Sequence, residues 1–167
     1  MFNTHALSGW ILEQVSFDHG TAKASVSDYD SRGPDRAFDG NSGTYFYTGR
    51  STPFNKFVWF QFQTPIIPGR ISIMPHQHGN FEKFGPTKWQ FIASNGIEGE
   101  CSKDSSSWTV LCEDLSGEEF TSLGQRKSCD ASDEMTTAFY CLGVKILDSG
   151  SRRPAATLSE IKMWKKT

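Results

Sequence analysis

One stretch of the chain organises the interpretation of the rest: RAFDGNSGT at residues 36–44, followed directly by the aromatic run YFY at 45–47. Two apolar residues lead into a turn built from Asp, Gly, Asn and Ser, the residue types that bend a backbone tightly. Asp39, Asn41 and Thr44 add side-chain oxygens to the carbonyl oxygens of this turn. Clustered oxygens suit either a hard cation such as Ca2+ or an Asx turn whose hydrogen bonds are made within the turn. The residues alone favour the Asx turn and leave the cation open.

The remainder of the chain has the pattern of an all-β protein. Short segments rich in β-branched and aromatic residues, several of them alternating apolar and polar positions, are separated by loops rich in Gly, Pro, Asn and Asp. The run FVWFQF at 57–62 is apolar on both faces, which predicts a central strand that is covered on both sides. We therefore predict one antiparallel β-sandwich domain that spans residues 1–167. The other expected strands are 10–17, 22–26, 70–74, 88–93, 108–112, 139–147 and 158–164.

Composition and charge limit the possible functions. The chain of 167 residues is long enough for one domain with a real core, and 37% hydrophobic with 13% aromatic residues fits a globular β protein. A formal net charge of −2 argues against nucleic-acid binding, which usually needs a strongly basic face. No apolar run approaches the ~20 residues of a membrane span. Residues 1–14 lack the pattern of a signal peptide, so we expect a chain made without one or a mature chain with an added Met.

Four cysteines lie in the C-terminal half of the chain: Cys101, Cys112, Cys129 and Cys141. An even number at wide spacing suits two disulfides in an oxidising compartment, and hence an extracellular or cell-surface protein. The alternative is four reduced, buried thiols in a cytoplasmic protein. The spacing of the cysteines does not predict a zinc site, because no two of them form a Cys-x-x-Cys pair. Three disulfide connectivities are possible, and the sequence does not choose among them.

Charged residues are unevenly distributed along the chain. Acidic residues outnumber Lys and Arg between 98 and 134, whereas 145–167 is basic. The simpler interpretation is a solvated acidic loop region and a basic terminal edge. The alternative is that Arg152 and Arg153 form a basic loop that meets an anionic ligand, such as a sulfated or sialylated glycan or a phospholipid head group.

The motif AFDGNSGT, with the aromatic residues after it, resembles the signature of discoidin domains, also called coagulation-factor type C domains. Further pieces of the pattern follow in the same order over residues 23–164: VWFQF at 58–62, GRISI at 69–73, WQFIASNG at 89–96, WTVL at 108–111 and LSEIKMW at 158–164. Discoidin domains belong to the galactose-binding-like superfamily. The resemblance therefore implies a jelly-roll β-sandwich and a binding or adhesion function without catalysis.

The resemblance also implies a metal. Relatives of this kind often hold one structural Ca2+ at the Asp-Gly turn, closed by a Glu near the C-terminus. Carried over to this sequence, the metal ligands are Asp39, Asn41, Thr44 and Glu160. Such an ion prefers six to eight oxygens and would tie two distant parts of the chain together. Because Asn41 stands where a second Asp would add charge, we expect a lowered affinity for the ion.

By resemblance, the ligand site lies in loops at one end of the sandwich: 28–34, 47–56, 76–84 and 149–154. Aromatic side chains in these loops can stack on the apolar face of a pyranose ring, and polar side chains can hydrogen-bond its hydroxyls. The alternative is that these aromatic residues only close the end of the sandwich. The candidate stacking residues are Tyr47, Phe54 and Phe81, and the candidate hydrogen-bonding residues are Arg50, His76, His78, Asn80 and Arg152.

Other functions remain as alternatives to glycan binding. A membrane module of the coagulation-factor kind would use Phe54, Phe57 and Phe81 as apolar spikes, above the basic residues Arg50, Lys56, Lys83 and Arg153. A protein partner is a third alternative. The two histidines of His76-Gln77-His78 can chelate zinc, but no third ligand is near in sequence. Fucose-binding relatives carry an Arg-x-Asp sequence after the histidine, and this chain lacks it there. No nucleophile elbow or phosphate loop is visible, so we do not expect an enzyme.

Overall fold

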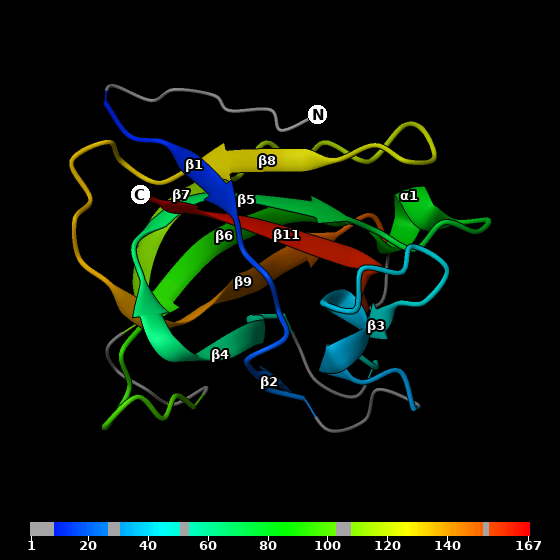
Figure 1. The fold of residues 1–167 in the computed structure, drawn as a ribbon. Helices are drawn as coiled ribbons and strands as arrows, with labels where there is room; N and C mark the ends of the chain where they lie inside the picture. The colour runs from blue at the N-terminus through cyan, green and yellow to red at the C-terminus, as the bar shows by residue number, and fades with distance from the viewer. Residues whose placement is uncertain (1–8, 27–30, 51–53, 103–107, 152–153) are drawn as a thin grey trace.

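Two antiparallel β-sheets pack face to face in the computed structural model, which describes residues 9–26, 31–50, 54–102, 108–151 and 154–167 (Figure 1). One sheet has the strand order β2 (Gly20–Ala24), β4 (Lys56–Ile66), β9 (Phe139–Ser149), β6 (Pro86–Ser94) and β7 (Thr109–Asp114). The other has the order β1 (Leu12–Gln14), β11 (Glu160–Lys166), β5 (Pro68–Met74) and β8 (Lys127–Asp130). β3 (Phe46–Tyr47) pairs with β10 (Thr157–Leu158), and two short helices complete the described elements: η1 (Pro34–Ala37) and α1 (Phe81–Phe84). The predicted antiparallel β-sandwich is confirmed.

The run 57–62 lies in the first half of β4, which is a central strand, as the two apolar faces of this run predicted. β4 lies between β2 and β9 in the five-stranded sheet. Val58, Phe60 and Phe62 point into the core between the sheets, whereas Trp59 is only 3% exposed on the opposite face. There Trp59 packs against Trp108, with 5.6 Å between the ring centroids. Both faces of β4 are therefore covered.

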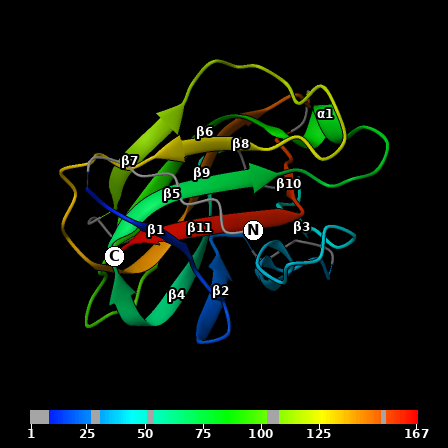
Figure 2. The same cartoon turned by 45° about the horizontal axis from the view of Figure 1, so that its top comes forward.

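Two disulfides confirm the expectation of paired cysteines, and the fold decides their connectivity. Cys112 on β7 is bonded to Cys129 on β8. These two strands are the edges of the two sheets, so the bond joins the sheets along one side of the sandwich (Figure 2). Cys101 is bonded to Cys141 and fastens the segment after β6 to the outer face of β9. Two disulfides of this kind are consistent with an extracellular location.

The strands depart from the sequence pattern in three places. β1 covers three residues of the predicted 10–17. β8 was not predicted, because Lys127–Asp130 has neither an apolar run nor a clear alternation. On β7, Val110 is 47% exposed, although it alternates with Trp108 and Cys112 in the predicted strand 108–112. The register between β6 and β7 shifts between Phe91 and Ile92, and such a bulge rotates the following side chains.

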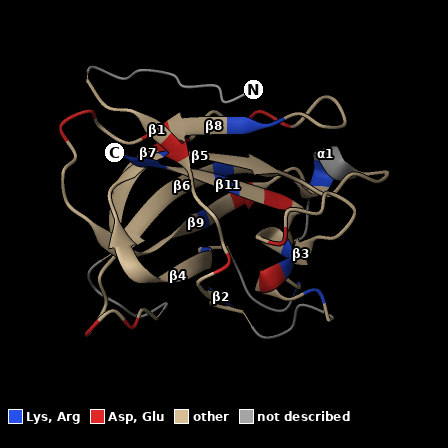
Figure 3. Ribbon diagram, viewed as in Figure 1, with Lys and Arg blue, Asp and Glu red and all other residues tan. Residues whose placement is uncertain are grey.

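The four-stranded sheet carries charges of both signs (Figure 3), and two ion pairs form on its outer face. Arg70 forms two hydrogen bonds with the carboxylate of Asp130, at 2.5 and 3.1 Å, and this pairing raises the pKa of Arg70. Arg126 pairs with Glu160 on the same sheet. Within the part of the chain that the structure describes, no helix has the length and apolar character needed to cross a membrane.

Candidate ligand-binding cleft

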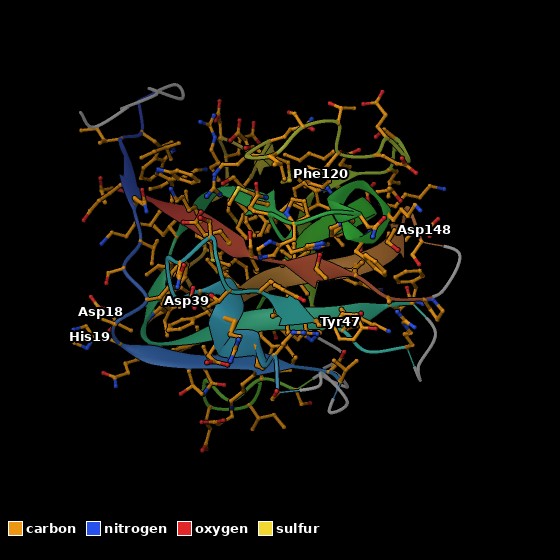
Figure 4. The ribbon with its side chains drawn as sticks, turned by 90° about the vertical axis from the view of Figure 1, so that its right-hand side faces the viewer. Asp18, His19, Asp39, Tyr47, Phe120 and Asp148 are labelled. Carbon is orange, nitrogen blue, oxygen red and sulfur yellow. A yellow bond between two sulfur atoms is a disulfide. The ribbon has the colours of Figure 1, made fainter. Side chains whose placement is uncertain are left out.

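A cleft of about 580 Å³ lies at the loop end of the sandwich, beside β3 and β10. Four segments form it: Arg32 before η1, the residues around β3, the 76–84 segment after β5, and β10. Figure 4 looks at this end of the molecule and shows Tyr47, with Asp39 lying well to one side of it. The described residues that line the cleft are Arg32, Tyr45, Tyr47, Gly49, Arg50, His76, His78, Gly79, Phe84 and Thr157.

Backbone hydrogen bonds bring the walls of the cleft together. Tyr47 on β3 lies opposite Thr157 on β10. The N–H of Tyr47 donates to the carbonyl oxygen of Arg32 at 3.1 Å, and the N–H of Thr48 donates to the carbonyl oxygen of Ala156 at 3.0 Å. Arg32, Tyr47 and Thr157 are therefore positioned by main-chain contacts, which gives the cleft a rigid frame.

Lys56 anchors the two loops beside the cleft. It opens β4, and although it is charged it is only 2% exposed. Its Nζ donates to the carbonyl oxygen of Gly49 at 3.0 Å, to Thr48 Oγ1 at 3.4 Å and to the carbonyl oxygen of Pro154. Gly49 precedes β4, whereas Pro154 follows β9. One ammonium group thus holds the loops before and after these strands against each other.

His76 forms part of the floor of the cleft and is 6% exposed. Its Nδ1 lies 2.8 Å from Thr157 Oγ1, and its Nε2 lies 3.3 Å from the carbonyl oxygen of Gly79. Because a carbonyl oxygen only accepts, Nε2–H donates to Gly79, and Nδ1 shares a hydrogen bond with the Thr157 hydroxyl. Both ring nitrogens are engaged within the protein. His76 therefore holds the floor of the cleft in place. It was predicted to hydrogen-bond a sugar, but both of its ring nitrogens already contact protein atoms.

Aromatic rings surround His76. The centroid of the Tyr45 ring lies 5.2 Å from that of His76, and the centroid of Phe84 lies 6.1 Å away. The guanidinium carbon of Arg32 lies 4.8 Å from the centroid of Tyr45. His78, whose ring centroid is 6.3 Å from that of His76, is exposed. The cleft thus combines apolar ring surface with donors at its edges, the combination that a sugar ring requires.

Four of the eight predicted ligand residues line this cleft: Tyr47, Arg50, His76 and His78. Phe54 does not line it, because its ring packs against the core and lies 5.8 Å from the Lys56 ammonium. Asn80 has a positive φ of 69°, and its carbonyl oxygen accepts hydrogen bonds from the N–H groups of the next turn. It is exposed beside the cleft and begins the turn that leads into α1. The side chain of Phe81 and the whole of Arg152 lie outside the described residues.

Phe54 and Phe57 do not form the exposed apolar spikes that a membrane module would need. They are the two of the three candidate residues whose side chains the structure describes. Phe54 is half-buried against the core. Phe57 is half-buried beside Trp108, at 5.9 Å between centroids, and Lys145 lies 5.3 Å from its ring. Lys56, expected among the basic residues beneath the spikes, is buried and bonded to loop carbonyls. Lys56 and Phe57 are packed because alternate positions of β4 point to covered faces of its sheet, and Phe54 packs on the core just before that strand.

Several lining residues were not singled out from the sequence. Arg32 and Phe84 lie inside loops that were expected to surround the ligand, but no feature distinguished them from their neighbours. Tyr45 belongs to the aromatic run after the turn. Thr157 had no signal at all, because its place in the cleft depends on the pairing of β10 with β3.

The Asp39 turn is satisfied by its own hydrogen bonds. The Asp39 carboxylate accepts from the N–H of Asn41 at 2.8 Å and from Thr44 Oγ1 at 2.5 Å. Asn41 Oδ1 accepts from the N–H of Gly43 at 2.9 Å, and the carbonyl oxygen of Asn41 accepts from the N–H of Thr44 at 3.2 Å. This is the Asx-type turn that the sequence favoured.

The predicted fourth ligand, Glu160, lies near this turn. Asp39 and Glu160 line the same hollow of about 350 Å³. Glu160 pairs with Arg126 and also lies 3.7 Å from Lys162 Nζ. In the described part of the chain, no three His, Cys, Asp or Glu side chains converge on one point. The zinc alternative at His76 and His78 gains no third ligand from these residues.

Solved structures share the fold of this chain. The family 32 carbohydrate-binding module of Clostridium perfringens NanJ, in complex with galactose, has a TM-score of 0.69 at 16% identity over 93% of this chain and 100% of that chain. The structure of two family 32 modules of C. perfringens ZmpB, in complex with GalNAc, has a TM-score of 0.68 at 18% identity. This match covers 91% of this chain and 34% of that chain. A chitosan-binding module from a chitosanase/glucanase of Paenibacillus sp. IK-5 has a TM-score of 0.69 at 15% identity, over 91% of this chain and 99% of that chain.

These likenesses establish the galactose-binding-like β-sandwich fold. No family model matches the chain, and no curated protein matches it. The solved structures are carbohydrate-binding modules that share their jelly-roll fold with discoidin domains, so the specific discoidin assignment is not confirmed.

Proposed function

We propose that this protein is a non-catalytic glycan-binding module and that the glycan binds in the cleft beside β3 and β10. The observation that carries the proposal is the cleft itself, in which three aromatic rings and exposed donors converge at the loop end of the sandwich. Its volume of about 580 Å³ lies within the usual range for small-ligand sites. The similar modules of NanJ and ZmpB were solved with galactose and GalNAc, which supports a sugar as the ligand.

Each side chain of the cleft has a role in this proposal. Tyr45 and Tyr47 offer ring surface for stacking against a pyranose. Arg50 and His78 are exposed and donate to sugar hydroxyls, and Arg32 donates from its place on the Tyr45 ring. His76 acts through Thr157 and Gly79 by holding the floor in place.

The absence of catalysis is part of the proposal. Glycoside hydrolysis generally needs a pair of carboxyl groups on opposite sides of the scissile bond. Neither Asp nor Glu is found among the described residues that line the cleft. We further propose that the chain is one domain of discoidin type that acts outside the cell or at its surface. A single shallow site binds weakly, so firm attachment would come from several copies acting together.

A glycan array of neutral and acidic sugars, followed by titration of the best binder, tests the proposed function. We expect His78→Ala to weaken binding about tenfold, because one donor to the ligand is lost. His19→Ala is the matched control, since His19 is also exposed but lies on the turn before β2, away from the cleft (Figure 4). Silence of the whole array would refute glycan binding, and equal loss in both variants would refute the assignment to this cleft.

We also propose that the Asp39 turn and Glu160 hold a structural Ca2+. Two carboxylates, the Thr44 hydroxyl and the turn carbonyls supply the hard oxygen donors that this ion prefers. The ion would compete with Arg126 and Lys162 for Glu160 and with the Thr44 hydroxyl for Asp39. Calcium should therefore raise the Tm of the protein and EDTA should lower it, and Asp39→Asn should reduce both shifts. An identical Tm in calcium and in EDTA would leave Asp39 as a turn residue only.

A further inference from the structure

The charge of the cleft points to the class of sugar that it takes. Two arginines, Arg32 and Arg50, line the cleft, and no carboxylate accompanies them among its described lining residues. The ammonium of Lys56 lies directly behind the cleft, bonded to the carbonyl oxygen of Gly49. Positive charge is thus gathered on one concave surface of a chain whose formal net charge is −2.

The two arginines of the cleft differ from those of the outer sheet face. Arg70 and Arg126 each form an ion pair with a carboxylate of the protein. Within the described residues, neither Arg32 nor Arg50 forms one. A guanidinium group presents a planar fork of donors that matches a carboxylate or a sulfate with two parallel hydrogen bonds. The two cleft arginines therefore keep this capacity for a ligand.

The position of Arg32 leaves its donors available. Its guanidinium carbon lies 4.8 Å from the centroid of the Tyr45 ring. A guanidinium that stacks on an aromatic face keeps its in-plane N–H groups for other acceptors. The Tyr45 ring is itself held beside the buried His76, at 5.2 Å between centroids. Arg32 is thus held in place before a ligand arrives, which reduces the entropy lost on binding.

Arg50 extends into the cleft from an anchored backbone. It follows Gly49, whose φ is +71°, a conformation that glycine adopts without steric cost. The carbonyl oxygen of Gly49 is fixed by Lys56. The exposed Arg50 side chain can therefore reach an acidic group on a sugar that stacks against the tyrosines.

We propose that the cleft prefers an acidic sugar, one that carries a carboxylate or a sulfate ester on its pyranose ring, over the neutral sugar of the same configuration. This inference rests on the proposed glycan-binding function. It adds that charge-assisted hydrogen bonds from Arg32 and Arg50 supply much of the affinity.

Titrations with four sugars test the preference: galactose, galacturonic acid, galactose 6-sulfate and N-acetylneuraminic acid. Galacturonic acid differs from galactose only in the group at C6, so this pair isolates the charge. We expect galacturonic acid or galactose 6-sulfate, the two acidic sugars of galactose configuration, to bind about tenfold more tightly than galactose, as the charge-assisted contacts would produce. That advantage should shrink at about 1 M NaCl, where the Debye length is about 3 Å. The sugar that binds most tightly distinguishes a carboxylate from a sulfate ester.

Single substitutions locate the effect. Arg50→Gln and Arg32→Gln should each reduce the ratio of acidic to neutral affinity about threefold, so that the two contacts together account for the tenfold preference. Arg36→Gln is the control for net charge, because Arg36 lies on η1, outside the lining of the cleft, and also forms no ion pair among the described residues. Circular dichroism and Tm show whether each variant is folded.

The outcomes separate this inference from the function on which it rests. Galactose binding as tightly as every acidic sugar, with the cleft variants affected, would overturn the preference and leave the glycan-binding function standing. An unchanged ratio in both cleft variants, or an equal reduction in Arg36→Gln, would also overturn it. Binding of no sugar at all would refute both.

Discussion

Lys56→Met tests whether one buried ammonium holds the loops of the cleft together. Methionine keeps most of the length and apolar surface of the lysine stem, so the packing of the 2%-exposed side chain is retained. The substitution removes the hydrogen bonds that Nζ donates to Gly49, Thr48 and Pro154. We expect a less stable protein in which the loops before β4 and after β9 are loosened.

The magnitude follows from what each acceptor keeps. The carbonyl oxygen of Gly49 still accepts from Thr48 Oγ1 at 3.2 Å, and Thr48 Oγ1 still accepts from the N–H of Ala156 at 2.9 Å. Pro154 O alone loses its donor, as far as the described residues show. A buried carbonyl without a donor costs about 1–3 kcal/mol. Loss of the charge-assisted bonds adds to this, and relief from burying an ammonium offsets part of it, so we expect about 2 kcal/mol.

Thermal unfolding followed by circular dichroism measures this effect. For a chain of this size, about 2 kcal/mol corresponds to a fall in Tm of about 4–8 °C. Lys145→Met is the matched control, because Lys145 is half-buried on β9 and contacts the Phe57 ring at 5.3 Å, a contact worth at most about 1 kcal/mol. If Lys56→Met unfolds at the same temperature as the control, or above the wild type, the anchoring role of Lys56 is refuted.

Three other regions allow comparable tests. Joint replacement of Cys112 and Cys129 by alanine opens a loop of sequence separation 17 and should lower the free energy of unfolding in urea by about 3 kcal/mol. An unchanged urea midpoint would show that packing of the two sheets, without the disulfide, holds the β7–β8 side of the sandwich together. Asp39→Ala removes the acceptor of two hydrogen bonds in the turn and should cost about 1–2 kcal/mol in the same assay, against no loss if the turn is held by its backbone. The pKa of Glu100 is lowered, chiefly by a hydrogen bond from Lys23, so its contribution to stability is present above the ordinary glutamate pKa and lost as the pH falls through the lowered value. Glu100→Gln should flatten that part of the pH–stability curve, and a curve of unchanged shape would contradict this.

Local patterns were sufficient for the fold class and for the turn. The apolar faces of 57–62 predicted a covered central strand because side chains of a strand alternate between its two faces. The Asp39 turn was predicted because short polar side chains bond to the backbone within a few residues. An even number of cysteines predicted two disulfides, which the structure contains. Each of these properties depends on neighbours in the sequence or on composition alone.

The candidate site depended on contacts that the sequence does not display. Phe54 and Tyr47 are both aromatic residues beside the same loop, yet one packs on the core and the other lines the cleft. Thr157 reaches His76 only because β10 pairs with β3 and places them 2.8 Å apart. In the same way, Lys56 becomes an anchor because Pro154 is folded back onto it. Strand pairing between distant residues is decided by the packing of whole sheets, and so the sequence alone determined the β-sandwich and its Asp39 turn, whereas the tertiary structure decided the disulfide connectivity and the make-up of the cleft.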